Sequence, residues 1–183
     1  MKKDAAALSG MQLLIEAFDF AAYKHRDQRR KDAKASPYIN HPIQLARVLA
    51  IEGQITDEQV IAAAILHDTI EDTETTADEI RARFGVTVAT IVEEVTDDKS
   101  LPKAERKRLQ IEHASQCSRR AKLVKLADKI CNVRDMGTGA PAGWSLSRQQ
   151  EYFDWAKQVV DRVRGVSPTL EAAFDDAYAK RPE

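Results

Sequence analysis

Six ionisable side chains have the types that bind metal ions and exchange protons: His41, His67, Asp68, Glu71, Asp72 and Asp128. Four of them follow directly on an apolar run, residues 60–66, which has no polar face. If helical, that run is buried on all sides, and charged groups at its end need a partner because their removal from water is costly. A metal ion accepts imidazole and carboxylate together. The sequence therefore predicts a metal site formed by His41, His67, Asp68 and Asp128.

Two imidazoles and two carboxylates form a ligand set that suits Mn²⁺, Fe²⁺ or Zn²⁺, and Mg²⁺ less well. The neighbours His67 and Asp68 can bind one ion only where the backbone leaves helical geometry, as at the end of a helix. The alternative is a site without metal, in which His67 and Asp68 form a buried hydrogen-bonded pair and Asp128 is a structural ion-pair partner.

Two predicted helices carry most of these residues. The stretch Thr56-Asp57-Glu58-Gln59 has a capping-box pattern and predicts a buried helix through residue 66. Residues 119–136 form the second helix, in which Val124 and Cys131 lie at i−4 and i+3 from Asp128. A carboxylate between apolar neighbours needs a partner, which a metal ion would supply.

The rest of the chain also shows helical periodicity. Apolar residues from Leu8 onward predict a first helix that ends near Lys24, and Pro42, next to His41, suits the first position of another. The further predicted helices cover 77–85, 86–95, 103–113, 147–163 and 168–178. Their boundary signals are Thr76, Gly85, Ser147, Gly165 and Ser167-Pro168. Residues 86–95 would also allow a strand, but the sequence offers no partner strand, so we expect an all-α bundle of about nine helices.

Composition limits the class of function. The 183 residues suit one domain with a full hydrophobic core. The 28 basic and 29 acidic side chains nearly balance, so no overall field favours nucleic acid or a membrane surface. The two cysteines fit a reducing compartment, and no apolar run approaches the roughly 20 residues that span a bilayer. We expect a soluble cytoplasmic protein in which charge acts locally.

Residues 25–32 are basic and polar and have two interpretations. A solvated loop is the common role of such a charged stretch. A phosphate-binding segment is the alternative, because arginine and lysine side chains suit phosphate oxygens.

The pattern of His41, His67-Asp68 and Asp128 resembles the HD-domain metal-dependent phosphohydrolases. More specific segments narrow the resemblance: residues 28–31, 37–42, 67–72, 95–99 and 125–132, which read QRRK, PYINHP, HDTIED, VTDDK and KLADKICN. Together they resemble the hydrolase domain of the RelA/SpoT alarmone enzymes, and in particular the stand-alone small alarmone hydrolases of the metazoan SpoT-homologue type. The resemblance extends from about Leu13 to about Tyr178.

This resemblance implies removal of the 3′-pyrophosphate from guanosine tetra- or pentaphosphate (ppGpp or pppGpp), giving GDP or GTP, with one Mn²⁺ preferred. It places the metal ligands on His41, His67, Asp68 and Asp128 and the catalytic pair on Glu71 and Asp72. It places substrate contacts on Arg30, Lys31, Lys103, Asn132, Arg148 and Tyr152. It also implies a single HD domain over residues 1–183, with its core at 13–178, and no synthetase activity.

Other functions stay open from the residues alone. An HD hydrolase could act on NADPH or another ribose-phosphorylated nucleotide, and a non-catalytic HD module could bind alarmone, although Glu71 and Asp72 argue against a pure binder. A helical scaffold with a structural metal is the third alternative. His113 lies where some HD enzymes place a ligand of a second metal, but the resemblance favours one ion. The aromatic helix near Trp155 could form a homo-oligomer interface.

Overall fold

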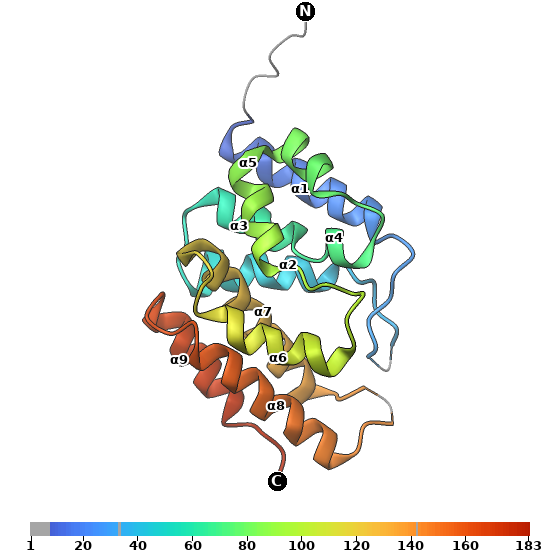
Figure 1. The fold of residues 1–183 in the computed structure, drawn as a ribbon, viewed down its shortest axis with the longest axis vertical. Coiled ribbons are helices and arrows are strands. Elements are labelled where there is room, and N and C mark those ends of the chain that lie inside the picture. The colour runs from blue at the N-terminus through green and yellow to red at the C-terminus, as the bar shows by residue number, and fades with distance from the viewer. Residues whose placement is uncertain (1–7, 33, 142) are drawn as a thin grey trace, which may run out of the picture.

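The computed structural model describes residues 8–32, 34–141 and 143–183, and these ranges are built from helices joined by short loops (Figure 1). The helices are α1 Gly10–Lys24, α2 Asn40–Arg47, the π-helical η1 Val48–Glu52, α3 Glu58–Leu66, α4 Thr69–Asp72, α5 Ala77–Val95, α6 Lys103–Ala114, α7 Arg119–Thr138, α8 Leu146–Asp161 and α9 Pro168–Tyr178. Within these ranges there is no β-strand, only an isolated bridge between Arg29 and Pro37. The all-α prediction is confirmed.

The helix count differs from the expected nine because α5 is one element with a break inside it. Gly85 has φ 87° and ψ 167°, a conformation that glycine alone adopts without strain, and the chain continues as helix on both sides of it. The described ranges therefore hold eight α-helices of at least eight residues, and the single turn α4 that follows His67-Asp68. The predicted boundary at Gly85 is confirmed, because Gly85 is non-helical and two helical segments meet there within α5.

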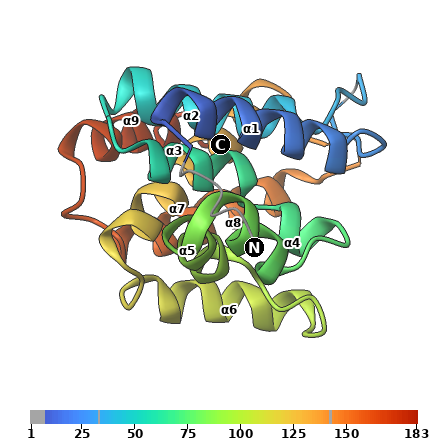
Figure 2. The same cartoon turned by 90° about the horizontal axis from the view of Figure 1, so that it is seen from above.

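Helix α3 is the central element of the bundle. Every residue from Val60 to Leu66 is buried, and α3 packs against α1, α2, α5 and α7. Seen from above, α3 lies between α1 and α7 (Figure 2). Its three consecutive alanines, 62–64, leave space for these neighbours to approach closely. Burial on all sides, as the sequence predicted, fixes the end of α3 in the middle of the protein.

The helix caps agree with the sequence in type and differ in position at two places. Thr76 and Ser167 cap α5 and α9 as expected, by accepting from the amides of Glu79 and Leu170. Helix α3 is capped by Asp57 rather than Thr56, because the Asp57 carboxylate accepts from an amide two residues on. Helix α8 is capped by Ser145 rather than Ser147 and ends at residue 161, not near 165.

Helix α8 packs against both α6 and α7, and α6 lies directly above α8 in the view of Figure 1. As predicted, α6 is an outer helix, with Ala114 its buried residue. None of the described helices is both long and apolar enough to cross a membrane.

Candidate metal centre and its cavity

The break between α3 and α4 places His67 and Asp68 together. Helix α3 ends at residue 66 and α4 starts at residue 69, while Asp68 has φ −97° and ψ −1°. The Thr69 hydroxyl donates to the carbonyl oxygen of residue 66 at 2.7 Å and stabilises this turn. As a result, His67 Nε2 lies 2.9 Å from Asp68 Oδ2. The turn between α3 and α4 thus brings the side chains of two adjacent predicted ligands into contact.

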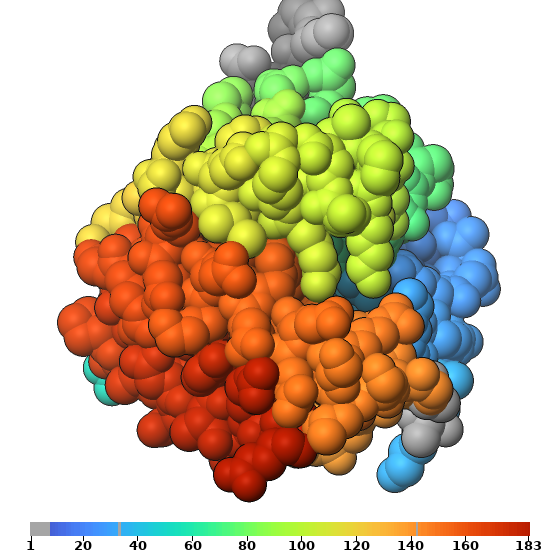
Figure 3. Space-filling model, turned by 60° about the horizontal axis from the view of Figure 1, so that its bottom comes forward, coloured from blue at the N-terminus to red at the C-terminus, as the bar shows by residue number. Residues whose placement is uncertain are grey.

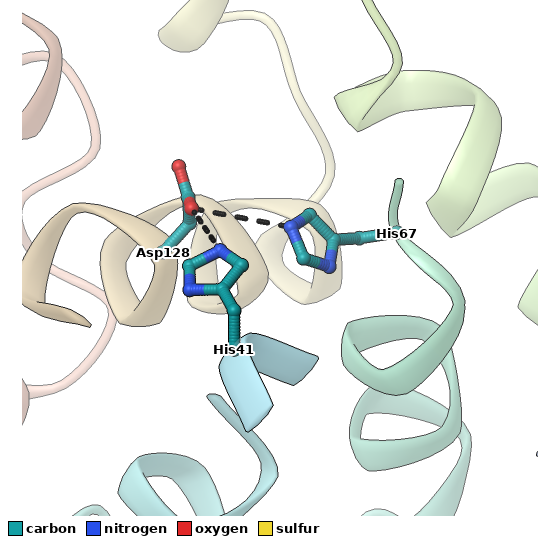
Figure 4. Close-up of side chains that lie close together, drawn as sticks. All are labelled: His41, His67 and Asp128. Atoms are coloured by element: carbon teal, nitrogen blue, oxygen red, sulfur yellow. Dashed lines mark hydrogen bonds and ion pairs between the residues drawn. The ribbon is translucent and has the colours of Figure 1, made fainter. Parts of the chain in front are cut away.

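Three possible metal ligands from distant parts of the chain converge at this point (Figure 4). One ligand atom each from His41, His67 and Asp128 lies within 4.8 Å of the other two. His41 Nε2 is 3.2 Å from Asp128 Oδ1, and His67 Nε2 is 3.9 Å from the same oxygen. His41 is the second residue of α2, and Asp128 lies in α7. Asp68, the fourth predicted ligand, joins through its contact with His67.

The tautomer of His67 favours a cation between these groups. Its Nδ1 is hydrogen-bonded to the carbonyl oxygen of Ala64 at 2.9 Å, so Nδ1 carries a proton and Nε2 faces Asp68 and Asp128. Burial alone would lower the pKa of His67, but these two carboxylates raise it to about 9. The site therefore attracts positive charge, and its donor set fits a divalent ion.

Further side chains hold the two carboxylates in place. Asp128 accepts from Lys129 Nζ at 2.8 Å and from Asn132 Nδ2 at 2.6 Å. Asp68 accepts from the Tyr38 hydroxyl. Sequence reasoning missed Tyr38 and Lys129. Tyr38 lies in the segment PYINHP, which could have pointed to it, whereas residue i+1 of a helix does not normally face the same side as residue i.

The two predicted catalytic carboxylates have different environments. Glu71 lines the cavity next to the metal centre, and burial, with the nearby charges of Asp68 and Asp97, raises its pKa to about 7. Asp72 does not line that cavity. Its carboxylate accepts from Lys99 and from Gln28 Nε2, the latter at 2.8 Å.

A cavity of about 240 Å³ opens beside the metal centre, between α6 and the chain around the start of α8 (Figure 3). Four of the six predicted substrate contacts line it: Arg30, Lys103, Asn132 and Tyr152. The other two, Lys31 and Arg148, are not part of the lining, but both charges lower the pKa of Lys103. The basic stretch at 25–32 thus contributes Arg30 to the cavity wall, which supports its interpretation as a phosphate-binding segment.

Cations lie close to aromatic rings in the cavity and beside it. In the lining, Lys107 Nζ lies 4.6 Å from the Trp155 ring centroid. Outside the lining, the Trp144 ring centroid lies 5.8 Å from Lys103, which lines the cavity, and 4.1 Å from Arg148. Burial and neighbouring cations lower the pKa of Lys107, so a bound polyanion would relieve this repulsion. Sequence reasoning missed Lys107, because α6 is rich in charge throughout.

Three other aromatic or histidine side chains have defined positions in the structure. Trp155 donates its indole hydrogen to the carbonyl oxygen of Lys107 and lines the cavity. His113 is exposed and lies outside the cavity. His25 is buried, and its Nδ1 lies 2.6 Å from Gln28 Oε1.

The fold and this site define an HD-domain protein, and the family model for the HD domain matches residues 17–153. The chain belongs to the HD-domain family, as its motifs predicted. It is similar to guanosine-3′,5′-bis(diphosphate) 3′-pyrophosphohydrolase MESH1 of Danio rerio, at 57% identity over 173 residues, which cover 94% of this chain and 96% of the relative. The Homo sapiens protein of the same name is 58% identical over 168 residues, covering 92% and 94%.

A solved structure shares the same fold over nearly the whole chain. It is described as "A metazoan ortholog of SpoT hydrolyzes ppGpp and plays a role in starvation responses". It matches with a TM-score of 0.91 and 48% identity and covers 97% of this chain and 98% of that structure. The likeness therefore extends to every helix that carries a site residue.

Proposed function

We propose that this protein is a metal-dependent guanosine-3′,5′-bis(diphosphate) 3′-pyrophosphohydrolase. In this reaction the oxygen of a water molecule bonds to the 3′-phosphorus, and the bond from that phosphorus to the ribose 3′-oxygen breaks. The tetraphosphate gives GDP and the pentaphosphate gives GTP, with pyrophosphate as the second product. The observation that carries the proposal is the convergence of the metal ligands and Glu71 at the mouth of a cation-lined cavity, in a chain that matches hydrolases of this name end to end.

The proposed metal ligands are His41, His67 and Asp128, which converge in the structure, together with Asp68, which contacts His67. This ligand set suits Mn²⁺, Fe²⁺ or Zn²⁺, and we propose Mn²⁺ as the single ion because the resemblance to the alarmone hydrolases implies it. When bound, such an ion lowers the pKa of a coordinated water molecule and stabilises charge at the attacked phosphorus. Lys129 and Asn132 hold Asp128 in orientation for this role.

We assign Glu71 to orienting and deprotonating the attacking water. Its raised pKa, about 7, is suited to proton exchange near neutral pH. Arg106 Nη1 lies 3.4 Å from Glu71 Oε1, and the amide of Asp97 donates to Oε2 at 3.3 Å. These contacts fix the orientation of the Glu71 carboxylate. Asp72 is assigned as its partner, because Lys99 contacts Asp72 and lies 3.9 Å from Glu71 Oε1.

The substrate's phosphates would be neutralised by cations of the cavity and its rim: Arg30, Lys31, Lys103 and Arg148. The near-neutral charge of the whole chain supplies no such attraction. Asn132 and Tyr152 line the cavity on the side of α7 and α8 and would contact the nucleoside. The missed residue Lys107 adds a fifth cation to this set.

We also propose that residues 1–183 act as one HD hydrolase domain with its core at 13–178, in the cytoplasm. Buried apolar residues from Leu13 to Ala177 form one continuous cluster, which supports a single domain. Both cysteines are free thiols, and Cys131 is buried, which fits a reducing compartment. Residues 1–7 lie outside the described ranges.

The direct test is hydrolysis of guanosine tetraphosphate by metal-stripped protein, with and without added Mn²⁺, with the products separated. We expect Mn²⁺-dependent release of GDP and intact pyrophosphate. NADPH is the comparison substrate, because a general 2′- or 3′-phosphatase would release inorganic phosphate from it. A folded, metal-loaded protein that hydrolyses NADPH but not the tetraphosphate would overturn the proposal.

A further inference from the structure

Lys125 of α7 has a mostly buried side chain whose ammonium group has no hydrogen-bond or ion-pair partner within the described ranges. The residue is 8% exposed, and its Nζ is not among the fully enclosed polar atoms that lack a partner, because Lys125 lines a recess. Lys129, one helical turn on, is also buried, but it contacts Asp128 at 2.8 Å. Partial removal of an ammonium group from water is costly without a partner, so an anion in the recess would compensate the charge of Lys125.

Lys125 lines a recess of about 50 Å³ that adjoins the main cavity. The two spaces share part of their walls: Asp68, Glu71, Gln110, Asp128 and Lys129. Beyond these shared residues, the recess is closed by His67, Val95, Val124 and Lys125. It is therefore a side compartment of the metal centre, and it is larger than one water molecule needs.

The charge of the recess depends on the metal ion. Its lining carries three carboxylates, Asp68, Glu71 and Asp128, and two ammonium groups, Lys125 and Lys129. Without a metal ion, protonated His67 adds a third positive charge, so that with Glu71 ionised the sum is −3 + 3 = 0. A divalent ion that takes the place of the His67 proton changes the sum to −3 + 2 + 2 = +1. The recess then suits an anion, and the anion would meet the unpaired Lys125 at its far wall.

We propose that this recess binds the terminal phosphoryl group of the substrate's 3′-diphosphate, with Lys125 Nζ donating to its oxygens. The inference rests on the proposed function and adds to it a preference for a 3′-diphosphate over a 3′-monophosphate. The attacked phosphorus must lie at the shared wall, next to Glu71 and the metal ligands. The nucleoside and its 5′-phosphates occupy the main cavity with Lys103 in its lining and Arg148 at its rim, so the second 3′-phosphoryl group extends to the opposite side. Lys125 therefore distinguishes a diphosphate from a monophosphate.

The test compares Lys125→Met with the parent and with Lys122→Met. Lys122 lies on the same helix, is half-exposed and lines neither space. Calorimetry on Mn²⁺-loaded protein measures the binding of pyrophosphate and of inorganic phosphate. We expect the parent to bind pyrophosphate more than tenfold tighter than phosphate, and Lys125→Met to lose roughly tenfold in pyrophosphate affinity, as for a charge-assisted hydrogen bond. Phosphate binding and the Lys122→Met variant should change less than about twofold.

Steady-state kinetics on two substrates and a stability measurement complete the test. For guanosine tetraphosphate, Lys125→Met should lower kcat/KM roughly tenfold, whereas for guanosine 5′-diphosphate 3′-monophosphate it should leave kcat/KM within about twofold. Urea denaturation of the metal-free protein should show Lys125→Met at least as stable as the parent, because an unpaired buried charge has been removed. Lys125→Gln keeps a hydrogen-bond donor without the charge, so its kcat/KM for guanosine tetraphosphate should lie between those of the parent and of Lys125→Met.

Equal affinity of the parent for pyrophosphate and phosphate would overturn the inference without any variant, and so would unchanged pyrophosphate binding in Lys125→Met. Equal losses for both substrates would assign Lys125 a structural role instead. A parent protein that fails to hydrolyse the tetraphosphate would overturn the proposed function, and this outcome is separate from the binding results.

Discussion

Gln28 Nε2 donates to Asp72 Oδ2 at 2.8 Å, and this bond joins the loop after α1 to the end of α4 across 44 residues of sequence. The other end of the Gln28 amide, Oε1, contacts the buried His25 ring at 2.6 Å. Since the amide nitrogen faces Asp72, the oxygen must accept from His25 Nδ1. The chain of contacts gives Gln28 a fixed orientation and gives Asp72 a fixed donor.

Gln28→Glu should impair catalysis more than Gln28→Ala. The alanine variant removes one donor, and we expect kcat to fall roughly fivefold. The glutamate variant places a second carboxylate against Asp72, so kcat should fall more than about tenfold through repulsion between like charges. Steady-state kinetics on both variants provides the measurement, with Gln116→Glu, an exposed site, as the control. Equal kcat in Gln28→Glu and Gln28→Ala would refute the orientation given to the amide.

Asp68→Ala and Glu71→Gln should separate metal binding from proton transfer. Asp68→Ala removes a proposed ligand, so bound metal and activity should fall together. Glu71→Gln keeps the cavity shape and should keep the metal while kcat falls by about 10²–10⁴, the usual contribution of a general base. Metal analysis of the dialysed variants, next to their kinetics, is the measurement, and Asp27→Ala, at an exposed site, is the control. Full metal occupancy in Asp68→Ala would contradict the ligand assignment.

The activity should show an acidic limb set by Glu71. Burial and the charges of Asp68 and Asp97 raise the pKa of Glu71 to about 7, and a base acts only when ionised. As pH falls through that pKa, the ionised fraction decreases, so kcat/KM should fall about tenfold per pH unit. The charge of a bound metal ion opposes the raised pKa, so the limb should lie at or below pH 7. A profile of kcat/KM from pH 5 to 9 checks this, and a limb centred above pH 8 would exclude Glu71 as the base.

Two glycine-to-alanine substitutions should shift stability in opposite directions. Gly85 has φ 87°, so an alanine there is strained even though its Cβ would meet nothing within 4 Å, and we expect a loss of about 1–3 kcal/mol in the free energy of unfolding. Gly137 lies inside α7, and a Cβ there meets only Lys180 at 3.9 Å, so Gly137→Ala should gain about 0.4–1 kcal/mol. Urea denaturation of both variants measures the difference. A neutral Gly85→Ala would mean that the kink in α5 relaxes without cost.

The metal centre was predictable because its residues carry two independent signals. His67 and Asp68 follow a run with no polar face, and Asp128 lies between apolar neighbours, so each carboxylate required a partner. The end of α3 at Leu66 was predicted, but residue types alone could not show that a new turn, α4, starts at Thr69, because a single turn is shorter than any periodicity can detect. Cap positions were off by one or two residues at Asp57 and Ser145, because several neighbouring side chains in each stretch can accept the same amide hydrogens.

The supporting residues of the site could not be predicted in the same way. Tyr38 reaches Asp68 across 30 residues of sequence, and Lys107 meets Trp155 across the interface of α6 and α8. Such contacts depend on how helices pack, which local pattern does not specify. Lys125 shows the same limit, since its position on a mixed charged and apolar helix gives no sign that it lacks a partner.

The chain has two tryptophans, one in the cavity lining and one beside it. Trp155 lines the cavity, and the Trp144 ring centroid lies 5.8 Å from the lining residue Lys103 and 4.1 Å from Arg148. Indole emission responds to nearby charge and to water, so filling the cavity should change the intrinsic fluorescence of the unlabelled protein. The rings next to these cations thus provide an optical signal, by which nucleotide occupancy can be followed in real time during turnover.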